Sequence, residues 1–302
     1  MTARQVTHVV VAAGGLGTRV RQWSQFLPKE FYPVDGRPGI VHLLTEIAAL
    51  QPVQVAIVYH PYYEPFIQWA KHVLQPGSLA RYQASSREAS FPERAIPEMD
   101  LEFIAQRGPY ADVTSILNGA DHLPRGPLLL AFADNLYCGA TPLLDLTAAT
   151  PDTVAVLARP FNLSESEHRG VIICGRAGSQ VVMSDLVEKP GAAQVADLVG
   201  RHGPDNLRLL EGRAHLTTDF IDYLRTAQPH TAHTEPKLSQ TLAHYSHRRR
   251  VEVITTTTPV TDLGAPSSPS LAFAGGPCTT RLPGSLGDGL PDSSSPREVA
   301  AR

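Results

Sequence analysis

The chain has 302 residues, 42% of them hydrophobic, and a formal net charge of −3 at pH 7. This length and apolar fraction support a sizeable core in one large domain, or in one domain with an appendage. The slightly acidic balance argues against an electrostatic nucleic-acid binder, because such proteins carry an excess of lysine and arginine. We therefore expect no nucleic-acid partner.

Cysteines and apolar segments indicate the cellular setting. The three cysteines show no metal-ligand spacing and are odd in number, so neither a zinc site nor a disulfide framework is indicated. Residues 1–7 lack the pattern of a secretory signal. No segment approaches the roughly 20 apolar residues that a membrane span needs. A cytoplasmic protein without a membrane partner is predicted.

The first 160 residues alternate between apolar strands and amphipathic helices. Residues 8–13 form a near-continuous β-branched run, which is typical of a strand buried on both faces of a parallel sheet. Further strands are predicted at 53–59, 101–105, 128–133 and 153–158, and helices at 40–50, 62–74, 113–123 and 143–149. The alternation predicts an α/β fold with a Rossmann-like, mostly parallel sheet flanked by helices. Ligands of such sheets bind at the carboxyl ends of the strands.

The spacing changes after about residue 160. A strand pair is predicted at 170–174 and 180–187, helices at 217–225 and from Pro236 to 247, and a last strand at 251–256. From Gly264 onward Ser, Pro and Gly dominate without periodicity. We predict one domain over residues 1–264, with a first part to about 160 and a second part from about 161, followed by a disordered tail over 265–302.

A glycine-rich loop follows the first strand and reads Gly14-Gly15-Leu16-Gly17-Thr18-Arg19. Such glycines let the backbone turn sharply and approach a ligand, and their N–H groups can form an anion-binding nest. The loop is neither a Walker A motif nor a dinucleotide fingerprint. Pro28-Lys29-Glu30 follows ten residues later, so Arg19 and Lys29 supply two cations beside the loop. A triphosphate requires such a pair.

Three later segments carry charged residues at the ends of predicted elements. Asp134 ends an apolar strand, where a carboxylate can hold Mg²⁺ against a triphosphate, although a loop-capping aspartate has the same pattern. Glu188-Lys189-Pro190 ends another strand and could equally be a surface charge pair before a proline turn. Asp262 lies in Thr261-Asp262-Leu263-Gly264, which in isolation would be an ordinary turn.

The order and spacing of these segments resemble the sugar-1-phosphate nucleotidylyltransferase family. The glycine loop, the Pro28-Lys29-Glu30 segment and the later carboxylates span residues 8 to about 266 in the family's order. The Pro-Lys-Glu variant is most similar to bacterial UTP–glucose-1-phosphate uridylyltransferases, with glucose-1-phosphate thymidylyltransferases as close relatives. The resemblance implies an enzyme that joins a nucleoside triphosphate to a sugar 1-phosphate and releases pyrophosphate. UTP is favoured over dTTP, and glucose 1-phosphate is the favoured sugar.

The resemblance also implies roles for individual residues. Arg19 would bind the β- and γ-phosphates and Lys29 the α-phosphate. The remaining nucleotide contacts would come from Ala13, Gly14, Gly15, Gly17, Thr18 and Gln106. The sugar phosphate would be contacted by Gly170, Glu188 and Lys189, and the cofactor Mg²⁺ by Asp134 and Asp262. Residues 1–160 would then be the nucleotide-binding part and 161–264 the sugar-phosphate part.

The chain departs from the family pattern at several positions. Ala111, Ala133 and Arg169 replace the usual Gly, Gly and Tyr, and the Ser/Pro/Gly tail replaces a helical segment. Asp112 either places a carboxylate near the base or ribose or serves as an ordinary helix N-cap. A non-catalytic sugar-nucleotide sensor or partner subunit on the same fold is the alternative function, and the resemblance leaves a homo-oligomer open.

Overall fold

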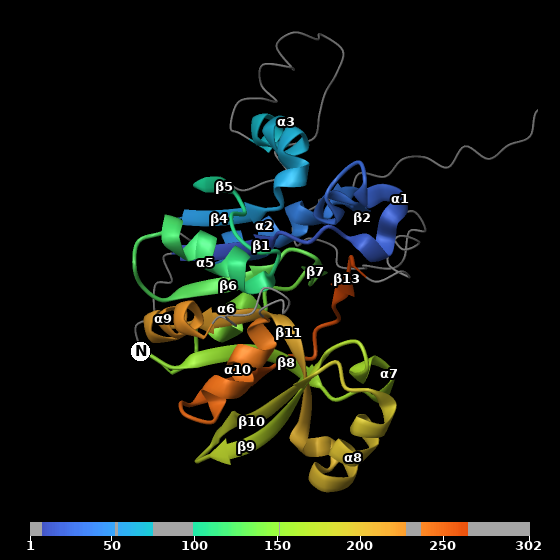
Figure 1. Cartoon of the computed structure of the whole chain (residues 1–302), viewed down its shortest axis with the longest axis vertical. Coiled ribbons are helices and arrows are strands. Elements are labelled where there is room, and N and C mark those ends of the chain that lie inside the picture. Colours follow the sequence, from blue (N-terminus) through green and yellow to red (C-terminus); the bar gives the residue numbers. More distant parts are fainter. Residues whose placement is uncertain (1–7, 52–53, 75–98, 151, 228–236, 265–302) are drawn as a thin grey trace, which may run out of the picture.

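The computed structural model describes residues 8–51, 54–74, 99–150, 152–227 and 237–264, which fold around one nine-stranded sheet (Figure 1). The strand order is β5-β4-β1-β6-β11-β8-β12-β10-β9. Within the described ranges, no helix is long and apolar enough to cross a membrane. Pro236 and the predicted tail over 265–302 lie outside these ranges.

The sheet strands are β1 (His8–Ala13), β4 (Gln54–Tyr59), β5 (Leu101–Ala105), β6 (Leu128–Phe132), β8 (Val154–Pro160), β9 (Gly170–Ala177), β10 (Gln180–Glu188), β11 (Leu207–Leu216) and β12 (Val251–Thr255). Two further pairs of short strands lie outside the sheet, β2 (Pro33–Val34) with β3 (Arg37–Pro38) and β7 (Asn135–Leu136) with β13 (Thr261–Asp262). The helices are α1 (Arg21–Ser24), α2 (Gly39–Ala48), α3 (Glu64–Leu74), α5 (Asp112–His122), α6 (Leu143–Leu146), α7 (Leu163–Ser166), α8 (Ala192–His202), α9 (Thr218–Thr226) and α10 (Leu238–Ser246).

The sheet is mixed, so the prediction of a mostly parallel, Rossmann-like sheet is wrong for its second half. The strands β5, β4, β1 and β6 run parallel to one another, and β8 runs parallel to β12. The other pairings all involve β10 or β11 and are antiparallel. β10 follows β9 through a turn at Gly178, whose φ is +65°, and so short a connection can join only antiparallel strands.

Helices cover both faces of the sheet, as the apolar run at 8–13 predicts. Val10 and Ala12 point to one face, where α5, α9 and α10 pack. Val9 and Val11 point to the other, where α2 and α6 pack. Alternate residues of β1 are therefore buried against different helix layers, which explains why the strand is apolar throughout. The α/β layering is confirmed.

Two elements, β11 and α8, lie in a region where no strand or helix was predicted. β11 reads Leu-Arg-Leu-Leu-Glu-Gly-Arg-Ala-His-Leu and looks too polar for a central strand. It nevertheless pairs with β6, β8 and β9, because its Glu211 and Arg213 are buried in ion pairs with distant residues. The sequence pattern alone does not reveal such non-local partners.

Candidate active site

The glycine loop leaves the carboxyl end of β1 and is held by side chains from three other segments. Gly17 has a φ of +60°, a conformation that favours glycine. Ser24 Oγ donates to the Gly17 carbonyl at 2.9 Å, and Tyr63 Oη donates to the Leu16 carbonyl at 3.1 Å. The Leu16 N–H donates to Tyr110 Oη at 3.2 Å. The loop is therefore already shaped by the protein itself.

Lys29 lies beneath this loop, in a short 3-10 helix (Lys29–Phe31). Its Nζ is 2.6 Å from Glu30 Oε1 and 3.1 Å from Asp134 Oδ2. Burial alone would lower the pKa of Lys29, but the charges of Asp134 and Glu30 outweigh burial and raise it. The same contact lowers the pKa of Asp134 against the opposing effect of its burial. Lys29 therefore carries a fixed positive charge at neutral pH.

Arg19, Asp134 and Asp262 meet around Gly264. A Cβ placed on Gly264 would lie 2.9 Å from Arg19 Nη2, 3.1 Å from Asp262 Oδ1 and 3.5 Å from Asp134 Oδ2. The pairing of β7 with β13 sets Asp262 opposite Asn135, and the Leu263 N–H donates to the Asp134 carbonyl at 2.8 Å. Two carboxylates 128 positions apart are thus brought to one place together with both predicted cations.

This donor set fits Mg²⁺. Mg²⁺ prefers carboxylate oxygens and is usually held by one or two carboxylates together with substrate phosphates and water. Among the described residues, no cluster of three or more His, Cys, Asp and Glu side chains forms an all-protein metal cage. Asp134 and Asp262 therefore match a metal that would be shared with a bound triphosphate.

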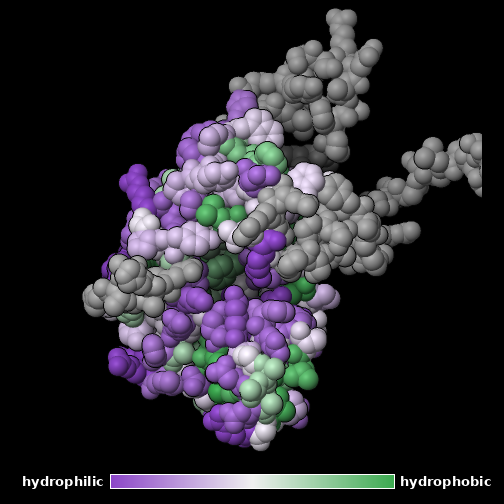
Figure 2. Space-filling view, turned by 45° about the vertical axis from the view of Figure 1, so that its right-hand side comes forward, coloured by the Kyte–Doolittle hydropathy of each residue, from purple (hydrophilic) through white to green (hydrophobic). Residues whose placement is uncertain are grey.

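A pocket opens between the glycine loop and the start of α5. It is lined by Ala12, Gly14, Gly15, Lys29, Tyr110, Ala111, Asp112, Ser115, Phe132 and Asp134. Figure 2 shows a recess near the middle of the molecule, with green, hydrophobic atoms inside it and purple, hydrophilic side chains along much of its rim. The predicted Thr18 instead lines a separate groove with Ser24, Tyr62 and Tyr63. Ala13 is the last residue of β1, just before the pocket, and is 6% exposed.

Gln106 is buried behind the pocket and fixed by three hydrogen bonds. Its amide nitrogen donates to the carbonyls of Pro109 at 3.2 Å and Ala111 at 3.4 Å, while Ser115 Oγ donates to its Oε1 at 2.7 Å. A Cβ on Gly14 would lie only 2.1 Å from Gln106 Oε1. Gly14 therefore has no side chain because Gln106 and Ser115 occupy that space.

Asp112 is not the N-cap of α5, although its carboxylate accepts from the Val113 N–H of that helix at 2.6 Å. Ala111 is the N-cap of α5, and Asp112 is the first helical residue. Its carboxylate accepts from the backbone N–H of Leu238, at 3.1 Å to Oδ1 and 3.2 Å to Oδ2, where α10 begins without a side-chain cap of its own. The carboxylate therefore ties the start of α10 to the start of α5, at the edge of the pocket.

Gly170, Glu188 and Lys189 form a second cluster at the paired ends of β9 and β10. Gly170 lies opposite Glu188 in the strand register, and a Cβ on Gly170 would lie 3.3 Å from Glu188 Oε2. Lys189 has a φ of +47°, and its N–H donates to the Arg169 carbonyl at 3.1 Å. Its Nζ is 3.8 Å from Glu188 Oε1, and its side chain is 53% exposed. The lysine is free to reach toward a ligand.

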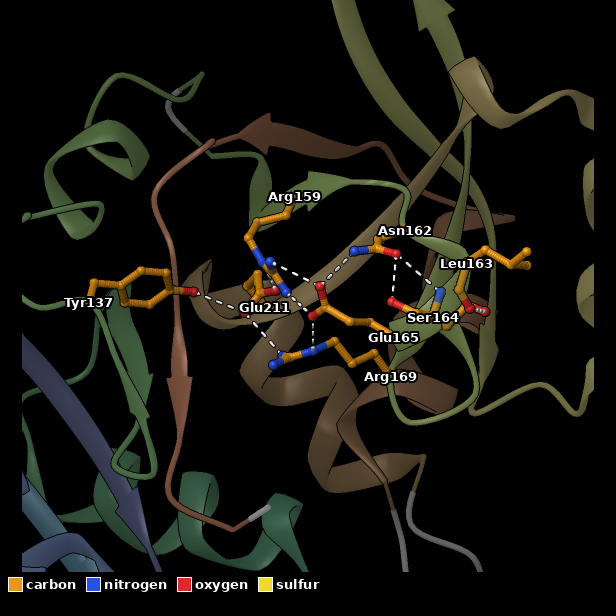
Figure 3. A network of polar contacts seen from close by, with 9 residues as sticks. Tyr137, Arg159, Asn162, Leu163, Ser164, Glu165, Arg169 and Glu211 are labelled. Carbon is orange, nitrogen blue, oxygen red and sulfur yellow. Dashed lines mark hydrogen bonds and ion pairs between the residues drawn. The ribbon is translucent and has the colours of Figure 1, made fainter. Parts of the chain in front are cut away.

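A charged network that the sequence motifs did not predict lies beside this cluster (Figure 3). Glu211 Oε1 accepts from Arg159 Nε at 2.6 Å, and Glu211 Oε2 lies 3.2 Å from Arg169 Nη1. Glu165 bonds to Arg159 and lies 3.4 Å from Arg169 Nε. The arginine that replaces the family's tyrosine is therefore neutralised by Glu165 and Glu211, and the network has no excess charge.

Comparisons with known proteins show what the whole chain is similar to. No family model matches the chain. In sequence, 256 residues are 23% identical to a UTP–glucose-1-phosphate uridylyltransferase of Staphylococcus epidermidis, covering 82% of this chain and 84% of that one. In structure, the chain is similar to a UDP-glucose pyrophosphorylase complexed with UDP-glucose, with a TM-score of 0.69, 20% identity, and coverage of 88% of this chain and 97% of that chain.

A further structural neighbour is a UTP-bound UGPase from Acinetobacter baumannii, with a TM-score of 0.66, 17% identity, and coverage of 88% of this chain and 92% of that chain. The chain is thus a relative of the sugar-1-phosphate nucleotidylyltransferases, and the resemblance stated from its motifs is confirmed. Within that class, the relatives named here are uridylyltransferases and UDP-glucose pyrophosphorylases.

Proposed function

We propose that the chain transfers a nucleotidyl group from a nucleoside triphosphate to a sugar 1-phosphate and releases pyrophosphate. The convergence of Arg19, Lys29, Asp134 and Asp262 at the glycine loop is the observation that carries this proposal. The relatives' names add UTP as the favoured nucleotide and glucose 1-phosphate as the favoured sugar phosphate. The resemblance of the motifs keeps dTTP as the second candidate nucleotide.

The reaction is a direct displacement at the α-phosphorus. An oxygen of the sugar phosphate forms the new P–O bond, and the bond from the α-phosphorus to pyrophosphate breaks. The attacking phosphate is already largely ionised, since its second pKa is about 6. No general base is therefore needed, and catalysis consists of positioning and charge neutralisation.

The chain's own charges supply that neutralisation. Lys29 is held protonated by two carboxylates and faces Gly15, so it can meet the α-phosphate. Arg19 can meet the outer phosphates, and Lys189 the phosphate of the sugar. Asp134 and Asp262 would hold Mg²⁺, which would offset the negative charge of the triphosphate. Preorganised charges of this kind stabilise the transition state more than solvent does.

Pyrophosphate release is the test. The wild-type chain is incubated with Mg²⁺, each of UTP, dTTP, GTP, CTP and ATP, and glucose 1-phosphate or other sugar 1-phosphates. We expect release that requires both substrates and is fastest with UTP. Binding of nucleotide or nucleotide sugar without release from any pair would reject the enzyme and favour the alternative, a non-catalytic sensor.

A further inference from the structure

Strand β11 carries two buried charges of opposite sign. Glu211 is 4% exposed and Arg213 is 1% exposed, and both lie between Leu210 and Ala214, where the pairing of β11 with β8 shifts register. Tyr137 touches both, because its hydroxyl donates to Glu211 Oε2 at 3.1 Å and its ring centre lies 4.9 Å from the Arg213 guanidinium carbon. Neither charge has a direct part in the displacement described above.

The Arg213 guanidinium grips the turn that carries Asp134. Its Nη1 donates to the Phe132 carbonyl at 3.0 Å, and its Nη2 donates to the Asn135 carbonyl at 2.7 Å. These carbonyls precede and follow Asp134 in the chain. A planar guanidinium has donors in a fixed fork, so it sets the spacing of both carbonyls at once.

Glu46 on α2 holds the fork in turn. Its two carboxylate oxygens accept from Arg213 Nε at 3.2 Å and Nη2 at 2.8 Å. The turn also lies directly against β11, since a Cβ on Gly212 would be 2.3 Å from Asn135 Oδ1. The Asp134 turn is therefore clamped between β11 and α2.

The second carboxylate depends on the same turn. Asp262 pairs with Asn135 across β13 and β7, and Leu263 bonds to the Asp134 carbonyl. A shift of the turn would carry Asp262 with it. Arg213 thus controls the place of both predicted metal ligands without touching either carboxylate.

Glu211 makes a corresponding connection to the segment that carries Lys189. It accepts from Arg169 and Arg159 (Figure 3), and the Arg169 carbonyl accepts the Lys189 N–H at 3.1 Å. Lys189 adopts a left-handed backbone conformation, which its surroundings must hold in place. Glu211 therefore supports the segment that presents Lys189.

We propose that Arg213 and Glu211 are positioning residues for two different parts of the site, Arg213 for the metal carboxylates and Glu211 for Lys189. This inference rests on the proposed function. It makes β11 the element that fixes the metal ligands relative to the sugar-phosphate lysine.

The test separates the two parts in steady-state kinetics. Arg213→Lys keeps the charge but cannot span two carbonyls and Glu46 together. We expect it to raise the half-saturating Mg²⁺ concentration about tenfold or more, as loss of groups that orient metal ligands does. The KM for the sugar 1-phosphate should stay within about twofold of wild type. Glu211→Gln should raise the KM for the sugar 1-phosphate about tenfold or more and leave the half-saturating Mg²⁺ concentration within about twofold of wild type.

Matched controls separate positioning from stability. Leu44→Ala truncates a fully buried side chain of α2, and Glu252→Gln changes a buried strand glutamate that bonds to Thr150. Both should lower the Tm and leave both kinetic constants unchanged. Glu46→Gln, a milder change than Arg213→Lys, should shift Mg²⁺ dependence in the same direction and serves if Arg213→Lys does not fold.

Two kinetic results would overturn the inference. One is a lowered Tm in Arg213→Lys and Glu46→Gln with the Mg²⁺ dependence of wild type, which would make the ion pair purely structural. The other is an equal change of both constants in the Arg213 and Glu211 variants, which would remove the division of roles.

Binding of Mn²⁺ with UTP, followed by electron paramagnetic resonance, distinguishes failure of the positioning inference from failure of the proposed function. Wild-type binding without turnover would contradict the proposed function, and weaker binding in Arg213→Lys would still support positioning. Equal binding by wild type and Arg213→Lys would overturn the positioning role. No binding by wild type would overturn both proposals.

Discussion

At the proposed nucleotide end of the site Lys29 is buried against two carboxylates, whereas at the proposed sugar end Lys189 extends into solvent. The Lys29 side chain is 8% exposed and lies within 3.1 Å of both Glu30 and Asp134. The Lys189 side chain is 53% exposed, and its Nζ lies 3.8 Å from Glu188 Oε1. The first lysine is fixed before any ligand arrives, and the second is not.

The strands around the two ends of the site also differ. The nucleotide end lies at the carboxyl ends of parallel strands, where a glycine loop and a buried strand supply rigid backbone. The sugar end lies where β9 and β10 meet antiparallel, and its charges come from a network of arginines and glutamates. We infer that the triphosphate meets a preorganised site and that the sugar phosphate helps to order its own.

Lys29→Ala should have the largest effect. Loss of a preorganised charge at the reacting phosphate should lower kcat by about 10²- to 10³-fold. It should also cost about 3–5 kcal/mol of unfolding free energy, because it leaves buried carboxylates without their partner. Steady-state kinetics and urea unfolding measure both. Lys71→Ala on α3 is the control, and a kcat near that of wild type would remove Lys29 from the site.

Lys189→Ala should act mainly on binding of the sugar phosphate. A charged hydrogen bond contributes about 1.5–3 kcal/mol, so the KM for the sugar 1-phosphate should rise about 10- to 100-fold. The Tm should change little, because the side chain is half exposed. Arg201→Ala on α8 is the matched control. A Tm loss as large as that of Lys29→Ala would contradict the proposed contrast between the two lysines.

The pH dependence of stability should sharpen the contrast. Lys29 lowers the pKa of Asp134, so in wild type the Lys29–Asp134 ion pair stabilises the folded state at neutral pH. This stabilisation is lost as the pH falls through the lowered pKa of Asp134. In Lys29→Met the carboxyls of Glu30 and Asp134 are buried without a cation, so their pKa values should rise and protonation should stabilise the folded state.

The difference in unfolding free energy between wild type and Lys29→Met should therefore narrow from pH 8 to pH 5. Urea unfolding at several pH values measures it. A difference that stays constant over this range would show that other groups compensate the charges of the buried carboxylates in the variant.

Asp112→Ala should have the smallest effect. It removes the acceptor for the Leu238 N–H and should cost about 1 kcal/mol of unfolding free energy. Asp112→Asn keeps an acceptor and should leave the KM for the nucleoside triphosphate close to that of wild type. A fivefold or larger rise of that KM in Asp112→Asn would show that the carboxylate contacts the nucleotide instead.

Local patterns made much of the first half predictable. The apolar run at 8–13, the glycine loop and the Pro28-Lys29-Glu30 segment are each contained in a few neighbouring residues. The predicted helices and strands of this half lie within a few positions of those in the structure. β1 was the plainest, since burial on both faces makes it apolar throughout. Gln106 was predicted as a nucleotide contact, yet it lies behind the pocket and supports the residues that line it. The roles assigned to these residues stay predictions.

The second half was less predictable because its strands are held by distant partners. β11 contains Glu211, Gly212 and Arg213 in its interior, and no apolar alternation marks it as a strand. Arg213 is buried only because Glu46, 167 positions away, receives it. Asp262 was found by its resemblance to a family motif, since no local pattern connects it with Asp134.

The most direct test of the proposed reaction follows the oxygen atoms. Glucose 1-phosphate labelled with ¹⁸O in its phosphate is incubated with UTP, Mg²⁺ and the wild-type chain, and the products are analysed by mass spectrometry. Direct displacement predicts a nucleoside diphosphate sugar that carries the label, together with unlabelled pyrophosphate. Labelled pyrophosphate, or hydrolysis of UTP without a labelled nucleotide sugar, would contradict the account.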